Sequence, residues 1–178
     1  MLAVPQPTET ETRDNAAFHA LLWALSRPGL PQTLPLPDEA AVIGALLDRE
    51  CRVYAAAPQL LPEIMRTGAE ITDIDKADHV FLGAVPSSDV LRSIAIGSDL
   101  YPDAGATVVT RAKIGTGAAV RLTGPGVEGD VVVYLDGLPD GFWAARAARI
   151  RYPMGFDMYF VDGTRMLGLP RSTTVEVL

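Results

Sequence analysis

The sequence predicts an α/β domain built on a mixed β-sheet with helices on both faces. In the first half of the chain, segments with helical periodicity alternate with short strand-like runs, a pattern typical of helices packed on a sheet. In the second half, strand-like runs follow one another through Gly-containing connections, which favours local antiparallel pairing. Residues 106–110 and 118–123 are rich in β-branched side chains, and we expect a buried antiparallel pair joined by a turn at 113–117.

The helices and strands have local boundary signals. Asp14 can cap a first helix that begins near Asn15, and this helix stops before Pro28 because the residue preceding a proline leaves the α region. Asp38 is expected to cap the second helix. The predicted helices cover residues 15–26, 38–47, 58–67, 87–94 and 139–151. The predicted strands cover residues 52–56, 79–84, 106–110, 118–123, 131–134, 156–161 and 166–169. The Asp-Gly pair at 162–163 is a strong hairpin signal between the last two strands.

Length and composition indicate one globular domain. The chain has 178 residues, of which 48% are hydrophobic and 21% are charged, as in ordinary globular proteins. Residues 1–13 are polar and contain prolines, so we expect a flexible N-terminal segment followed by a single domain over 14–178. The sequence has neither a secretion signal nor an apolar run of about 18 residues. We therefore expect a cytoplasmic protein with no membrane partner.

Charge and cysteine content argue against several partners and cofactors. The net charge of −7 and the lack of a basic stripe argue against a nucleic-acid partner, which requires clustered cations. Cys51 is the only cysteine, so the chain has no internal disulfide and no cysteine set for zinc or an iron–sulfur cluster. We expect a small buried thiol at this position, and no metal or other cofactor.

No pattern of side chains in the sequence is typical of a catalytic site. His19 and His79 are far apart, and each is expected to be structural or exposed. Ser98 lacks the second glycine of a nucleophile elbow. Lys76 and Lys113 are the only lysines that could form a Schiff base with pyridoxal phosphate, and both are expected at the solvated surface. We therefore assign no catalytic residue.

Three blocks of sequence are more specific than any single residue. The first is FHALLWALSRPG at 18–29. The second is PDAGAT at 102–107, continued by VRLTGPGV at 120–127. The third is YPMGFD at 152–157, continued by LPRSTTVEV at 169–177. In this order and spacing, the chain resembles the PhnH family, subunits of the bacterial carbon–phosphorus lyase system that degrades phosphonates.

The resemblance implies a fold similar to the large domain of pyridoxal-phosphate-dependent transferases, without the pyridoxal phosphate site. It also implies a homodimer that joins sister subunits of a core complex, notably the radical-SAM subunit. That complex couples a phosphonate to the ribose of ATP, giving a ribose 1-phosphonate 5-triphosphate, before the carbon–phosphorus bond is cleaved. The expected function is therefore that of an accessory, non-catalytic subunit.

Two other functions stay open at this point. A stand-alone enzyme could hold a phosphonate or a nucleotide with Arg27, Arg121 or Arg171 as oxyanion clamps. A binding module unrelated to phosphonates is the third possibility. If the chain is an accessory subunit, Arg146 and Arg149 are expected to meet acidic patches on a sister subunit.

Large apolar side chains gather late in the sequence. Phe142, Trp143, Met158 and Tyr159 belong to residue types that are enriched at the centres of interfaces. We expect them either to form a homodimer interface or to fill the core of the domain.

Overall fold

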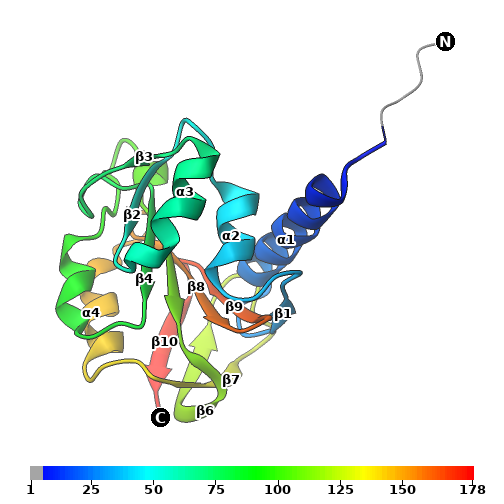
Figure 1. The fold of residues 1–178 in the computed structure, drawn as a ribbon. Helices are drawn as coiled ribbons and strands as arrows, with labels where there is room; N and C mark the ends of the chain where they lie inside the picture. The colour runs from blue at the N-terminus through cyan, green and yellow to red at the C-terminus, as the bar shows by residue number, and fades with distance from the viewer. Residues whose placement is uncertain (1–5) are drawn as a thin grey trace.

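Residues 6–178, which the computed structural model describes, form two β-sheets and a set of helices (Figure 1). The strands are β1 Gln32–Thr33, β2 Arg52–Ala55, β3 Glu70–Ile71, β4 His79–Gly83, β5 Thr107–Arg111, β6 Lys113–Thr123, β7 Val131–Asp136, β8 Asp157–Asp162, β9 Arg165–Leu169 and β10 Thr174–Val177. The α-helices are α1 Glu9–Ser26, α2 Glu39–Leu46, α3 Leu61–Thr67 and α4 Phe142–Arg149. The short 3₁₀ helices are η1 Pro58–Leu60, η2 Ser88–Ser93 and η3 Pro102–Ala104.

The large sheet is mixed, as the sequence predicts. It has seven strands in the order β1-β9-β8-β5-β4-β2-β3. The five strands from β8 to β3 run parallel to one another, whereas β9 and β1 are antiparallel additions at one edge. The hairpin predicted at the Asp-Gly pair is confirmed, because β8 and β9 pair in register up to Asp162 opposite Arg165. The prediction of an α/β domain with a mixed sheet is therefore confirmed.

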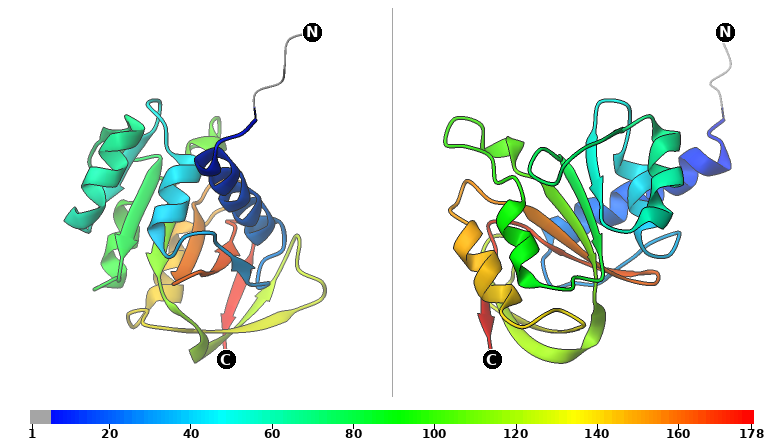
Figure 2. Two further views of the ribbon diagram at one scale, coloured as in Figure 1. Left: turned by 45° about the vertical axis from the view of Figure 1, so that its right-hand side comes forward. Right: turned by 60° about the vertical axis from the view of Figure 1, so that its left-hand side comes forward.

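The two faces of the large sheet pack against different layers. In β8, Met158 and Phe160 point into a core shared with β6, β7 and α4. Tyr159 and Val161 alternate with them and point into a second core shared with α1, α2 and α3. Helices thus lie on both faces, and Figure 2 shows α4 on the opposite side of the sheet from α1 and α2.

The expected antiparallel pair at the centre of the sequence is wrong. β5 lies inside the large sheet between β4 and β8, whereas β6 belongs to a separate three-stranded sheet of order β10-β6-β7. Ala112 alone separates the two strands. Val108, Val109 and Thr110 are all fully buried, because β5 is covered on both faces as parallel strands usually are. The glycines at 115 and 117 accommodate an irregularity within β6 instead of closing a hairpin.

The first helix begins at Glu9 and not near Asn15. Thr8 caps it through a reciprocal pair of hydrogen bonds: the Glu11 amide donates to Thr8 Oγ1 at 3.2 Å, and the Thr8 amide donates to Glu11 Oε2 at 2.6 Å. Part of the segment expected to be flexible is therefore helical, and residues 1–5 lie outside the described residues. None of the helices described is both long and apolar enough to cross a bilayer.

Asp38 does not cap α2 as expected. Its backbone has a φ of 54°, and its Oδ1 instead accepts a hydrogen bond of 2.9 Å from the amide of Gly163 in the β8–β9 turn. Ser87 does cap the segment that follows it, by accepting from the Asp89 amide at 3.2 Å, although that segment is the 3₁₀ helix η2. The start of α2 is thus held by the neighbouring hairpin.

Three of the four late apolar residues fill the core, so they cannot form the centre of a dimer interface. Phe142, Met158 and Tyr159 are at most 4% exposed. The Phe142 ring packs edge-on against Phe160 with 6.2 Å between centroids, and the Tyr159 hydroxyl donates to a buried main-chain carbonyl of α1. Of the four, only Trp143 is partly exposed.

Candidate functional site

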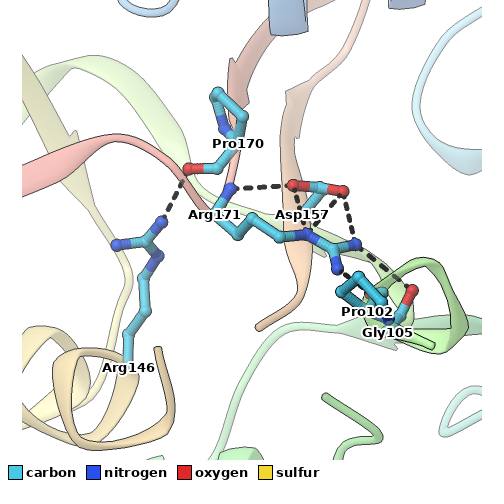
Figure 3. A network of polar contacts seen from close by, with 6 residues as sticks. All are labelled: Pro102, Gly105, Arg146, Asp157, Pro170 and Arg171. Atoms are coloured by element: carbon cyan, nitrogen blue, oxygen red, sulfur yellow. Dashed lines mark hydrogen bonds and ion pairs between the residues drawn. The ribbon is translucent and has the colours of Figure 1, made fainter. Parts of the chain in front are cut away.

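Arg171 is at the centre of a polar network that joins distant parts of the chain (Figure 3). It lies in the segment between β9 and β10, and Asp157 begins β8. Arg171 Nη2 donates to Asp157 Oδ2 at 2.8 Å, and the Arg171 amide and Nε donate to Oδ1 at 2.7 and 3.2 Å. The two side chains are only 15% and 22% exposed, so this forked ion pair is largely shielded from water.

The same guanidinium also holds the loop that enters β5. Arg171 Nη1 donates to the carbonyl of Pro102 at 2.5 Å, and Nη2 donates to the carbonyl of Gly105 at 3.4 Å. A Cβ atom at Gly105 would collide with the carbonyl oxygen of Gly155 and lie 2.6 Å from Arg171 Nη1. Segments 102–107, 152–157 and 169–177 therefore meet at one point at the amino ends of β5 and β8. Because the guanidinium is used in this way, Arg171 is not a free oxyanion clamp.

Arg146 and Arg149 on α4 bind main-chain carbonyls inside the molecule. Arg146 is 3% exposed and donates to the carbonyls of Thr173 at 3.3 Å and Pro170 at 2.9 Å. Burial lowers the pKa of Arg146 to about 10, so it stays charged at neutral pH. Arg149 is half-buried and donates to the carbonyl of Ile94 at 2.7 Å. α4 thus turns the Arg146 side chain inward, and contact of Arg146 or Arg149 with a sister subunit stays a prediction.

The other two candidate clamps lie on different elements. Arg27 directly follows α1, and its guanidinium lies 5.5 Å from the centroid of the Trp23 ring. Arg121 lies on β6, where it forms ion pairs of 3.3 Å with Asp130 and 2.8 Å with Glu176. The structure therefore does not bring Arg27, Arg121 and Arg171 together, and each has its own intramolecular partner.

A crevice with a charged lining at the opposite, carboxyl ends of β5 and β8 was missed by the sequence analysis. Its most unusual feature is Glu39, a carboxylate only 1% exposed that binds Arg111 through hydrogen bonds of 2.9 and 2.7 Å. The Arg111 side chain is 45% exposed, so a buried acid fixes a cation at the opening. The crevice has a volume of about 520 Å³ and is lined by Asp38, Ala84, Arg111, Ala112, Lys113, Asp136, Gly137, Val161, Asp162 and Gly163.

The crevice carries both signs of charge, and most of its groups are paired. Lys113 Nζ donates to Asp162 Oδ1 at 2.8 Å, and this hydrogen bond lowers the pKa of Asp162. Such a lining suits polar or zwitterionic molecules more than simple anions. Two features of the sequence could have indicated this crevice: Arg111 ends an apolar strand, and Glu39 is the first residue of an apolar helix.

The remaining nucleophile and base candidates are not brought together. Cys51 is half-buried, and burial raises the pKa of its thiol. His79 begins β4, and burial lowers the pKa of its imidazole, whereas His19 accepts a hydrogen bond from Trp23 on exposed α1. Within residues 6–178, no group of three acidic, histidine or cysteine side chains is arranged to hold a metal ion.

The Arg171 network predicts a clear difference between two arginine substitutions. Arg171→Met leaves the Asp157 carboxylate half-enclosed and two carbonyls without their donor, and should lower the free energy of unfolding by about 2–4 kcal/mol. Arg121→Met removes two exposed ion pairs and should cost less than about 1 kcal/mol. Urea denaturation of both variants measures the difference, and equal losses would contradict a structural role for Arg171.

Comparison with known proteins gives the family. A family model described as bacterial phosphonate metabolism protein (PhnH) matches residues 7–176. A candidate C-P lyase subunit protein from Stutzerimonas stutzeri, HtxG, is 31% identical, with 93% of this chain and 87% of that protein covered. A protein of Rhizobium meliloti (strain 1021) named alpha-D-ribose 1-methylphosphonate 5-triphosphate synthase subunit PhnH is 29% identical, with 90% and 89% covered. The resemblance predicted from the three sequence blocks is confirmed, and the chain belongs to the PhnH family of bacterial phosphonate metabolism proteins.

Proposed function

We propose that this chain is an accessory, non-catalytic subunit of a carbon–phosphorus lyase core complex. The complex couples a phosphonate to the ribose of ATP and so prepares it for cleavage of the carbon–phosphorus bond. The names of the two relatives, both described as subunits, support this function. The observation that carries it is the use of Arg171: the most specific sequence blocks converge on a guanidinium that holds the fold together instead of lining a reaction centre.

The alternative of a stand-alone enzyme with an arginine clamp has less support. Arg27 lies against Trp23, Arg121 is paired on the small sheet, and Arg171 is shielded by Asp157. A phosphonate requires several donors that converge on one point. A subunit that acts in assembly needs only a stable fold that presents a surface, and the Arg171 network stabilises this fold.

The accessory function predicts assembly together with inactivity alone. Co-expressed with its sister subunits, the chain should co-purify with them through gel filtration, chiefly by contact with the radical-SAM subunit. Deletion of its gene should abolish growth on methylphosphonate as the only phosphorus source, and growth on phosphate is the control. Release of adenine from ATP and methylphosphonate by the purified chain alone would contradict the proposal.

A homodimer would use the exposed apolar side of α1. Phe18 and Leu22 are 51% and 55% exposed, and with Leu25 they follow the i, i+4, i+7 spacing of a helix–helix seam. They border a hollow of about 240 Å³ whose lining contains no charged side chain. An uncharged surface can meet its own copy across a two-fold axis without repulsion between like charges, so we assign a second copy of the chain to this side of α1.

One substitution on α1 should separate dimer from monomer. An Asp in place of Leu22 puts like charges face to face in the interface, so Leu22→Asp should be a monomer where the wild type is a dimer that buries roughly 1,200–2,000 Å². Leu100→Asp is the matched control, because Leu100 is 76% exposed in a different part of the fold. Sedimentation velocity at micromolar concentration measures both, and a wild-type monomer would refute the dimer.

We further propose that the fold is a relative of the large domain of pyridoxal-phosphate transferases that does not bind the cofactor. The two lysines of the chain are the support: Lys76 and Lys113 are both exposed and paired with Asp73 and Asp162. Titration with pyridoxal phosphate should give no saturable band at roughly 410–430 nm, the region of protonated aldimines. A band lost in Lys113→Ala or Lys76→Ala would show a cofactor site.

A further inference from the structure

β10 is an edge strand with backbone groups that no other strand uses. It pairs on one side with β6, and no strand of residues 6–178 lies on its other side. The Leu178 amide donates to the carbonyl of Ala119 at 3.1 Å, and in an antiparallel ladder such hydrogen-bonded positions alternate along the strand. Thr174 and Glu176 therefore point their amides and carbonyls at β6. The amides and carbonyls of Val175 and Val177 point away from it, toward the open edge.

Helix α4 lies beside this edge, and two hollows between them together form a groove. Figure 2 shows α4 next to β10, on the side away from β6 and β7. At the start of β10 the groove widens to a hollow of about 310 Å³, and at its end to another of about 290 Å³. Trp143 lines both hollows, Val175 lines the first and Val177 the second. Side chains on one side of an extended strand recur every second residue, so one added strand could fill both hollows.

The first hollow carries an unbalanced positive charge. Arg146 and Arg171 line it, and none of its lining residues is acidic. Arg171 has Asp157 as its counterion, whereas Arg146 binds only carbonyls and its buried Nε has no hydrogen-bond partner among the described residues. The buried hydroxyl of Thr173 beside it is also without a partner. Asp157 attracts Arg146 through space, but its carboxylate is already bound by Arg171, so a carboxylate placed in this hollow would give Arg146 an acidic partner of its own.

We propose that β10 and α4 form a docking groove for an extended segment of a partner subunit. The segment adds a fourth strand to the small sheet through the free amides and carbonyls of Val175 and Val177. It places apolar side chains at alternate positions in the two hollows and an acidic side chain near Arg146. This inference rests on the proposed function, since it assigns the partner to the same assembly, and it is separate from the dimer contact on α1.

The β10 strand of a second copy of this chain would fit the groove less well than a partner segment that carries an acidic side chain. Glu176 lies opposite Arg121 and binds it on the outer face of the small sheet. The inner face of β10 therefore presents only Val175 and Val177, and no acidic side chain for Arg146. The charge in the hollow favours a different polypeptide.

Two proline substitutions test the backbone contact. Val177→Pro removes an amide that faces the open edge, which edge strands tolerate, whereas Glu176→Pro removes an amide that donates within the sheet. Titrated into a core complex purified without this chain, Val177→Pro should bind about tenfold more weakly than wild type while keeping its thermal midpoint. Glu176→Pro is the control, and it should lower the thermal midpoint.

A pair of neighbouring alanines on α4 tests the hollow. Ala147 and Ala148 are both exposed, but only Ala147 lines the first hollow. Ala147→Phe should fill the hollow and weaken binding to the core complex, whereas Ala148→Phe should bind like wild type. In the bound state, hydrogen exchange at the Val175 and Val177 amides should slow.

The possible failures can be told apart. If the wild type does not bind the core complex, the proposed accessory function is wrong and the groove inference falls with it. If the wild type binds and Val177→Pro and Ala147→Phe bind equally well, the groove alone is wrong. If Val177→Pro converts a dimer to a monomer, a second copy occupies the groove, which also overturns the inference.

Discussion

The ion pair between Arg171 and Asp157 determines how the two sheets of this protein are joined. Asp157 begins a central strand of the large sheet, and Arg171 stands three residues before β10, the edge strand of the small one. From the opposite side Arg146 binds the carbonyls of Pro170 and Thr173, so two guanidiniums hold the short connecting segment. The planar guanidinium of arginine suits this task better than the ammonium group of lysine, because its N–H donors reach several oxygens at once.

The same interactions explain why the most specific part of the sequence contributes so little reactive chemistry. Arginines that bind carbonyls and one enclosed carboxylate have few donors left for a substrate. Function then depends on what this framework presents at its surface. The apolar side of α1 and the groove beside β10 lie on different elements, so self-association and partner binding need not compete.

Local signals in the sequence predicted much of the fold. The β8–β9 hairpin follows from Asp162-Gly163, and the helix predicted over 58–67 ends at Gly68, which adopts the left-handed conformation common at helix C-termini. Thr8 and Glu11 have the spacing of a capping box, which is the local signal for the observed start of α1, whereas Asp14 lies inside the helix.

Long-range pairing could not be predicted in the same way. The runs that form β5 and β6 look like a hairpin because they are close in sequence, yet β5 is buried on both faces and pairs with β4 and β8. The partners of Arg171 lie 14 residues away at Asp157 and 69 away at Pro102, separations that no local pattern encodes. The direction of Arg146 on α4 depends in turn on the segment that Arg171 fixes.

The direct passage from β5 to β6 through Ala112 has a mechanical consequence. A link of one residue leaves the small sheet little freedom to rotate against the large sheet at this point. Arg171 holds the segment before β10 to Asp157 of the large sheet, so the small sheet is attached to the large one at two places. A neighbouring protein therefore meets β10 in an orientation fixed before contact, and little conformational entropy is lost when the two surfaces join.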